Sequence, residues 1–335
     1  MESLRTSVKW LHPVRNVRAT APSGEAIDVA SCGGYTAPQE DLILGVRDSE
    51  RYLYHYTSSR TAKKILANLT LRMGDLRGTN DPKESKEWHF DLTSTAGSDL
   101  DAWDKSKLAE ELSLTIKKHA RVLCFCKDGD SLSGNHVDDV ARRGHMRARM
   151  WAQYGENHAG VCLALDKKLL LEQVRAESER VISLWARDIL YWDRGILDGQ
   201  HERDYLIDVD VLRQVGFEQY WKLHAKQFYQ RLFFEKRLDW KDEREYRILA
   251  LLDRPREVFI DIRGCLRAVF FGDTAKISDF ESTIDELMAI GVQVMGLSWS
   301  NCCPWYDFAN PIFNAEMRAI AKEVETRGDN GSAET

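Results

Sequence analysis

Short apolar runs of strand length recur between residues 51 and 300, and segments of helical character separate some of them. The strand-like runs are RYLYHY, RVLCFC, GVCLALD, EREYRILALL, EVFIDI, CLRAVFFG and VQVMGLSW. Between them, segments such as 99–120 place apolar residues at helical spacing. Because some strands follow one another directly and others are separated by helices, the order predicts an α+β fold. We expect a mixed, largely antiparallel central sheet flanked by helices.

Four further elements are predicted with less regular patterns. DPKESKEWHFDL (81–92) is predicted to be helical, with Pro82 in its first turn. RRGHMRARMWAQYG (142–155) is predicted to be a helix that ends at Gly155. VISLWARDILYW (181–192) is predicted to be one strand, and residues from about 204 to 237 one long helix rich in aromatic residues.

The ends of the chain differ from its middle. Prolines and Ser-Gly and Gly-Gly steps indicate an N-terminal extension over residues 1–47, in which Trp10 could dock the extension onto the rest. We expect a single domain over residues 48–315, followed over 316–335 by the end of a helix and a disordered tail.

Composition and short motifs exclude several classes of protein. No run of about 18 apolar residues predicts a membrane span, and the first 20 residues lack the apolar stretch of a secretory signal. The seven cysteines form no C-x-x-C pair, which favours reduced thiols in a cytoplasmic protein. A net charge of −6 argues against a general electrostatic coat for nucleic acid. The chain has neither the glycine-rich dinucleotide motif nor the P-loop, zinc-protease or serine-hydrolase motifs.

Four segments, 54–57, 79–84, 150–160 and 236–249, concentrate aromatic, acidic, His and Asn residues near predicted strand and helix ends. In the first, His55 and Thr57 share one face of a strand. In the fourth, a period of two places Glu243, Glu245 and Arg247 on one face. Each segment also has a purely structural interpretation: a hydrogen-bonded histidine in a sheet, a helix cap before Pro82, a pair of core aromatic rings, and a solvated edge strand.

These segments, taken in order, resemble the DUF2971 family, an uncharacterised bacterial family. The matching pieces are YLYHYT, TNDPKE, LCFC, MWAQYGENHAG, WKDEREYR and AVFFGD, and they extend over about residues 50–300. A more distant resemblance is to the ADP-ribosyltransferase superfamily, in which an early strand carries His or Arg and a late strand begins near a Glu-x-Glu. HYTSSRTAKKIL and EREYR are similar to that scheme.

The second resemblance implies an ADP-ribosyltransferase-like core that consumes NAD, in a bacterial toxin or an anti-phage defence effector. Cleavage of the nicotinamide–ribose bond passes through an oxocarbenium-like transition state, which one well-placed carboxylate can stabilise. Glu245 is the candidate for that role, Glu243 for positioning or deprotonating the acceptor, and His55 for binding a ribose hydroxyl. The other candidate contacts to NAD are Tyr56, Thr57, Asn80, Trp151, Tyr154 and Arg247, with Trp151 or Tyr154 stacking on nicotinamide. Arg72, Arg147 and Arg149 are candidates for the pyrophosphate.

Two other functions stay open at this point. The same pocket could bind a nucleotide or nucleic acid without turnover, as a module of a defence system. Alternatively, Asp81, Glu84, Glu243 and Glu245 could hold Mg²⁺ or Mn²⁺ in a hydrolase or nuclease. The acceptor of a transferase, whether protein or nucleic acid, is not determined by the sequence. Convergence of His55, an aromatic ring and Glu245 on one cleft would favour the transferase.

Overall fold

The computed structural model describes residues 46–177, 181–193, 203–301, 303–307 and 310, together with two short paired strands, β1 (Ala19–Thr20) and β2 (Ala26–Ile27). Trp10, most of the predicted 1–47 extension and the whole of the predicted 316–335 tail lie outside the described residues. None of the helices in the described part of the chain has the length and apolar character that crossing a membrane requires.

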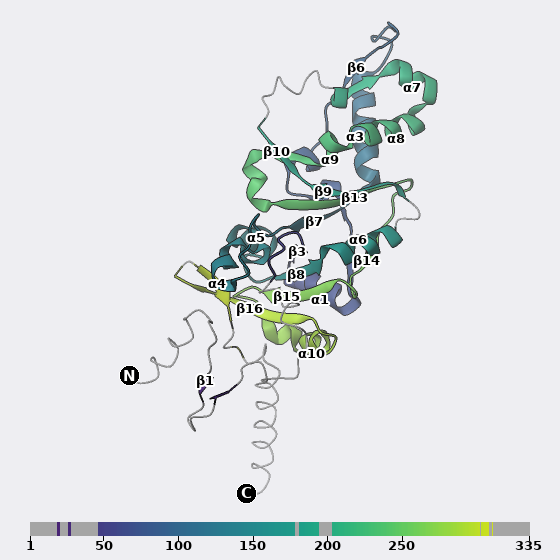
Figure 1. Cartoon of the computed structure of the whole chain (residues 1–335). Helices are drawn as coiled ribbons and strands as arrows, with labels where there is room; N and C mark the ends of the chain where they lie inside the picture. The colour runs from purple at the N-terminus through teal and green to yellow at the C-terminus, as the bar shows by residue number, and fades with distance from the viewer. Residues whose placement is uncertain are drawn as a thin grey trace.

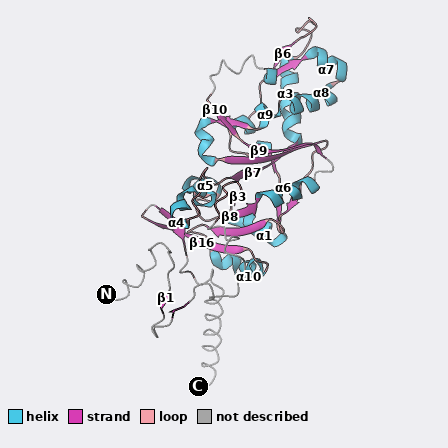
Figure 2. Cartoon of the chain, viewed as in Figure 1, coloured by secondary structure: helices cyan, strands magenta, loops and turns pink. Residues whose placement is uncertain are grey.

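A nine-stranded sheet forms the centre of the molecule (Figure 1, Figure 2). Its strands run in the order β17-β16-β15-β8-β3-β7-β13-β9, and β5 also pairs with β7. Among these strands only β15 and β16 are parallel. The predicted α+β fold with a mixed, mostly antiparallel sheet is therefore confirmed. The strand bounds are β3 Tyr52–Thr57, β5 Gly74–Asp75, β7 Ala120–Cys126, β8 Val161–Asp166, β9 Val181–Asp188, β13 Glu245–Leu252, β15 Leu266–Phe271, β16 Gln293–Ser300 and β17 Cys303–Tyr306.

Helices cover both faces of this sheet. On one face, α1 (Ser59–Asn68), α6 (Lys167–Ala176) and α10 (Glu281–Ala289) pack on alternate strand residues such as Leu53 and Ile248. On the other face there are two separate covers. Helices α3 (Lys105–His119), α8 (Phe217–Gln227) and α9 (Tyr229–Phe233) pack near Leu249, whereas α5 (Ala148–Tyr154) packs near Tyr54 and Tyr56.

Smaller elements connect these layers. Three two-stranded ladders pair β4 (Thr70–Arg72) with β14 (Phe259–Asp261), β6 (Asp91–Thr93) with β11 (Leu206–Asp208), and β10 (Leu190–Trp192) with β12 (Glu235–Arg237). The short α-helices are α2 (Pro82–Ser85), α4 (His136–Asp139) and α7 (Val209–Val215). The 3₁₀ turns are Leu76–Gly78, Val140–Arg142, Gly144–Met146, Arg203–Tyr205, Leu238–Glu243 and Ile277–Phe280.

Two predicted helices are shorter than expected. The helix predicted over 81–92 ends at Ser85, because the backbone N–H of Trp88 donates to the Ser113 hydroxyl and Trp88 packs under α3 in the core. The helix predicted over 142–155 begins only at Ala148. A Cβ on Gly144 would lie 2.3 Å from the Tyr54 ring, so the chain there follows the surface of that ring in a 3₁₀ turn.

Two longer predictions are wrong in their continuity. The helix predicted over 204–237 is divided into β11, α7, α8, α9 and β12. Gly216, with φ of +74°, ends α7, since that backbone conformation is not helical. The strand predicted over 181–192 is divided at Ile189: β9 forms the edge of the main sheet, whereas β10 leaves it to pair with β12.

Candidate functional site

A break in strand pairing opens a cavity in the sheet. Strand β7 shares one edge between two partners, because Val122 pairs with β5 and Cys126 pairs with Tyr54 of β3. Between these two contacts the ring Nδ1 of His55 lies 3.2 Å from the carbonyl oxygen of Cys124. The cavity at this point has a volume of about 240 Å³. Its lining residues are Tyr54, His55, Tyr56, Gly78, Thr79, Asn80, Glu84, Cys124, Phe125, Cys126, Met150, Tyr154, Lys236, Glu243 and Glu245.

The walls of the cavity come from segments that are distant in the sequence. Strands β3 and β7 form one side, the 78–84 segment another, and Met150 and Tyr154 of α5 a third. Lys236 comes from β12, and Glu243 and Glu245 come from the turn and strand that follow it. The cavity therefore lies where the two helical covers on this face of the sheet meet.

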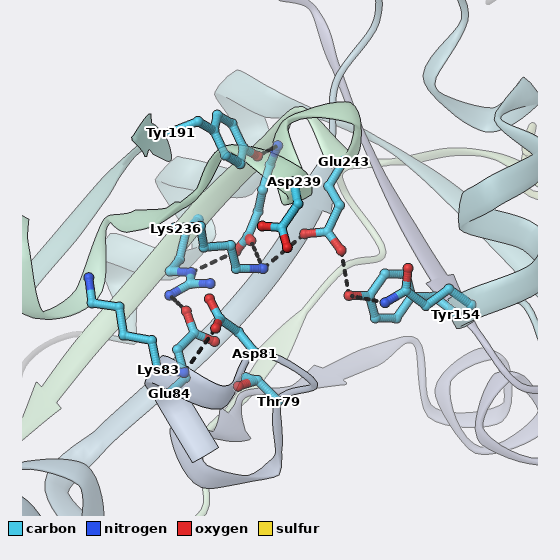
Figure 3. A network of polar contacts seen from close by, with 12 residues as sticks. Thr79, Asp81, Lys83, Glu84, Tyr154, Tyr191, Lys236, Asp239 and Glu243 are labelled. Carbon is cyan, nitrogen blue, oxygen red and sulfur yellow. Dashed lines mark hydrogen bonds and ion pairs between the residues drawn. The ribbon is translucent and has the colours of Figure 1, made fainter. Parts of the chain in front are cut away.

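Lys236 is the centre of a charged cluster on the cavity wall (Figure 3). Its Nζ lies 2.9 Å from Oε2 of Glu243 and 2.7 Å from Oε2 of Glu245, and its side chain is only 5% exposed. The hydroxyl of Tyr154 donates to Oε1 of Glu243 at 2.6 Å. The backbone N–H of Glu245 donates to the hydroxyl of Tyr191 at 2.9 Å. The cluster thus joins β12, β13, α5 and β10.

Arg247 extends this cluster behind the cavity. Its Nε donates to Oε1 of Glu245 at 2.6 Å, and its Nη1 donates to the carbonyl of Phe233 at 2.7 Å. Nη1 also forms an ion pair with Oε1 of Glu84. The Arg247 side chain is fully buried. Oε2 of Glu84 has no hydrogen-bond partner among the described residues, although Glu84 is only 1% exposed.

Burial and neighbouring charges fix the protonation states around the cavity. Burial alone would raise the pKa of Glu245, but the guanidinium of Arg247 and the ammonium of Lys236 lower it to about 2. Burial alone would lower the pKa of Lys236, but nearby carboxylates, chiefly those of Glu245 and Glu84, raise it above its ordinary value. Burial lowers the pKa of His55, which favours a neutral ring at pH 7. Burial, together with the Glu243 carboxylate, raises the pKa of Tyr154.

The turn before β13 differs from the predicted geometry. Glu245 and Arg247 do share one face of the strand, opposite Tyr246 and Ile248, as a period of two predicts. Glu243, however, precedes the strand and ends the 3₁₀ turn. Arg244, with φ of +45°, then reverses the chain, and this brings the carboxylates of Glu243 and Glu245 to the same Lys236 ammonium.

Six of the nine predicted site residues line the cavity: His55, Tyr56, Asn80, Tyr154, Glu243 and Glu245. The other three do not. Arg247 lies behind Glu245, and Thr57 is buried in β3. Trp151 is a core residue, because it is fully buried, donates from Nε1 to the carbonyl of His145 at 2.8 Å and meets the Tyr56 ring edge-on. The structure therefore leaves Tyr154, and not Trp151, in position to meet a ligand ring.

The three arginines considered for phosphate differ in position. Arg72 lies on β4 and forms an exposed ion pair with Glu257. Arg147 and Arg149 instead donate to the carbonyls of Asp242 and Asp239, both in the turn that contains Glu243. Only Arg147 and Arg149, of these three, therefore lie close to the cavity rim.

Lys236, Phe125, Cys124 and Met150 also line the cavity. They belong to segments that the sequence singled out, but they were not among the predicted site residues. Lys236 belongs to a run of mixed charges that is typical of a solvated loop, so its burial could not be recognised. Burial raises the pKa of the Cys124 thiol, which makes it a poor nucleophile.

Three of the four carboxylates predicted to hold a metal ion are paired with side-chain cations. Glu84 and Glu245 pair with Arg247, and Glu243 pairs with Lys236. Asp81 caps α2 by accepting the backbone N–H of Lys83. Within the described ranges, no group of three or more His, Cys, Asp or Glu side chains is arranged to hold a metal ion.

Comparison with known proteins identifies one family. Residues 150–248 match the model of the DUF2971 family, described as a protein of unknown function. The predicted resemblance is thereby confirmed for the MWAQYG and WKDEREYR segments, which include Tyr154, Glu243 and Glu245. The YLYHYT, TNDPKE, LCFC and AVFFGD segments lie outside the matched range. Neither a curated protein nor a solved structure matches the chain.

Proposed function

We propose that this chain is an ADP-ribosyltransferase-like enzyme that consumes NAD in the cavity between β3 and β7. The observation that carries the proposal is the convergence of three side chains from distant segments. His55 of β3, Tyr154 of α5 and Glu245 of β13 all line the one cavity. A neutral hydrogen-bonding ring, an aromatic surface and an ionised carboxylate are what a nicotinamide riboside group needs for binding and cleavage.

The proposed reaction cleaves the bond between nicotinamide and ribose. The bonding electron pair leaves with nicotinamide, which becomes neutral and needs no proton from an acid. Positive charge develops on the ribose, and an acceptor nucleophile then bonds to its anomeric carbon and loses its proton to a base. Because nicotinamide leaves as a neutral molecule, the reaction needs no protonated carboxyl group as an acid. This agrees with Glu245, whose pKa of about 2 keeps its carboxylate ionised.

Each group has a role in this scheme. Glu245 and the rest of the acidic wall stabilise the positive charge that develops on ribose. Glu243, whose Oε1 accepts from Tyr154, is the base for the acceptor. His55 binds a ribose hydroxyl, and Tyr154 packs against nicotinamide. A cavity of about 240 Å³ lies below the roughly 300–1,000 Å³ typical of ligand pockets, so it would hold this half of NAD, with the phosphates at the rim near Arg147 and Arg149.

The test is release of nicotinamide from labelled NAD, in the presence of a range of protein, DNA and RNA acceptors. We expect release by the wild type and a loss of at least about a hundredfold in Glu245→Gln, the size typical for removing one preorganised electrostatic group. Glu257→Gln is the matched control, because Glu257 forms an exposed ion pair remote from the cavity. Tyr154→Phe keeps the ring but removes the hydrogen bond to Glu243.

The outcomes separate two functions. No release from the wild type with any acceptor would refute the transferase. One observation favours binding without turnover: both oxygens of Glu245 are already engaged by Arg247 and Lys236. In that case the wild type would bind NAD in a calorimetric titration and leave it intact, as a nucleotide-binding module of a defence system would. Equal release by wild type and folded Glu245→Gln would place the chemistry on another residue.

A further inference from the structure

The charged side chains that line the cavity are not electrically balanced. The carboxylates of the charged cluster are those of Glu84, Glu243 and Glu245, and its cations are those of Lys236 and Arg247. Three formal negative charges therefore face two positive ones. Asp81, Lys83 and Lys117 lie next to the cluster, and they contribute one negative and two positive charges. The charges of this whole group therefore balance, but those on the cavity wall do not, because three carboxylates and only one ammonium line the cavity.

Glu84 is the member of the cluster with the fewest bonds. Its Oε1 pairs with Arg247, which it shares with Glu245, and its Oε2 has no hydrogen-bond partner among the described residues. Glu245, by comparison, contacts two cations, and Glu243 contacts Lys236 and Tyr154. Because Glu84 lines the cavity and is 1% exposed, a ligand in the cavity is the partner that could satisfy its Oε2.

The rest of the lining is rich in aromatic side chains. Rings of Tyr54, His55, Tyr56, Phe125 and Tyr154 contribute to the cavity wall. A flat cationic ring would be stabilised in two ways in this cavity, since it can pack on aromatic faces and lie near the carboxylates of the lining. A neutral ring of the same shape gains only the packing.

We propose that Glu84 determines specificity at this cavity, by supplying the negative charge that selects a cationic heteroaromatic ring over its neutral counterpart. This deepens the proposed function, because the nicotinamide of NAD is such a cation before cleavage and is neutral afterwards. Glu84 would then favour the substrate over the product and over reduced dinucleotide, without taking part in bond cleavage.

The experiment measures binding of two small probes, N1-methylnicotinamide as the cation and nicotinamide as the neutral ring, by calorimetry or ligand-detected NMR. An unscreened unit charge at about 6 Å, with an effective dielectric constant of about 20, would correspond to about a hundredfold in affinity before desolvation. Allowing for desolvation of the cation, we expect the wild type to prefer the cation by about tenfold. In Glu84→Gln we expect less than about a threefold preference, with the affinity for nicotinamide unchanged.

The ratio distinguishes selectivity from a loss of structure. If Glu84 has a purely structural role, Glu84→Gln should bind both probes more weakly. If Glu84 selects by charge, the variant should bind only the cation more weakly. Glu257→Gln keeps the wild-type ratio in either case. If Glu84→Gln does not fold, Glu84→Asp withdraws the carboxylate by one methylene and should lower the ratio by about threefold or more.

Three results would overturn the proposal: no binding of either probe to the wild type, no preference for the cation, or an unchanged ratio in the Glu84 variants. The outcome is independent of turnover. Cation selectivity without nicotinamide release would retain this proposal and refute the transferase. Nicotinamide release without cation selectivity would do the reverse.

Discussion

Replacing Arg247 with methionine should destabilise the protein strongly. Arg247 is fully buried, and its guanidinium is the shared partner of Glu84 and Glu245. Methionine fills much of the same space but leaves Glu84 without a cation and Glu245 with Lys236 alone. Breaking a buried ion pair by removing one partner costs about 3–5 kcal/mol, and we expect that loss in the free energy of unfolding.

The surface of the same protein offers a matched control. Arg263 forms an ion pair with Asp261 at 3.1 Å, a distance similar to those in the buried cluster, but its side chain is 64% exposed. Exposed pairs contribute about 0–1 kcal/mol, because water screens them and their side chains lose freedom on pairing. Arg263→Met should therefore change the free energy of unfolding by less than about 1 kcal/mol.

Urea unfolding followed by circular dichroism measures both variants, provided that the slope of free energy against urea stays constant. The double variant Arg247→Met/Glu84→Gln should be more stable than Arg247→Met alone, because it removes one of the carboxylates left unpaired. The expected coupling is about 0.5–3 kcal/mol. If Arg247→Met costs no more than Arg263→Met, the cluster is hydrated and the electrostatic reasoning about the cavity is wrong.

Three further predictions concern single residues. Glu245 has a folded pKa of about 2 against an ordinary 4.5, so its stabilising effect is complete above pH 4.5 and is lost as the pH falls through about 2. The wild type should thus lose about 3 kcal/mol more than Glu245→Gln between pH 5 and the acid limit, as measured by urea unfolding in that range. Burial lowers the pKa of Lys83 from 10.5 to about 8, so the unfolded chain binds more protons between these values. Wild-type stability should rise from pH 8 to 10.5 relative to Lys83→Met, and a flat difference would contradict this. Gly160→Ala should lower the melting temperature by several degrees, since its Cβ would lie 2.3 Å from the carbonyl oxygen of Thr57, and an unchanged melting temperature would show that the backbone yields easily.

The strands of the main sheet could be predicted because their sequences are nearly continuous apolar runs. GVCLALD and EREYRILALL read as buried strands and form β8 and β13. Helix ends were harder, because tertiary packing decides them. The pairing of Trp88 with the Ser113 hydroxyl ends α2 early, and nothing near Trp88 in the sequence indicates a partner 25 residues away.

In the candidate site, too, local strand geometry could be predicted from the sequence, whereas tertiary packing could not. Glu245 and Arg247 could be placed on one face by strand alternation alone. The packing of α5 on β3 decides whether Trp151 or Tyr154 lines the cavity. Trp151 contacts the Tyr56 ring and donates to the His145 carbonyl, so it lies in the core. Lys236 was missed for a different reason, because a lysine inside EKRLDWKDE is usually solvated.

The cost of the charged cluster is itself an argument for function. Arg247 ties β13 to α2 through Glu84 and to the end of α9 through the Phe233 carbonyl, while Lys236 ties β12 to β13. Apolar side chains of similar volume could hold the same elements together at equal or greater stability, because desolvating ions offsets most of their attraction. Stability therefore does not explain five charged groups beside one cavity. A ligand that carries positive charge would explain them, since three carboxylates and only one ammonium line that cavity.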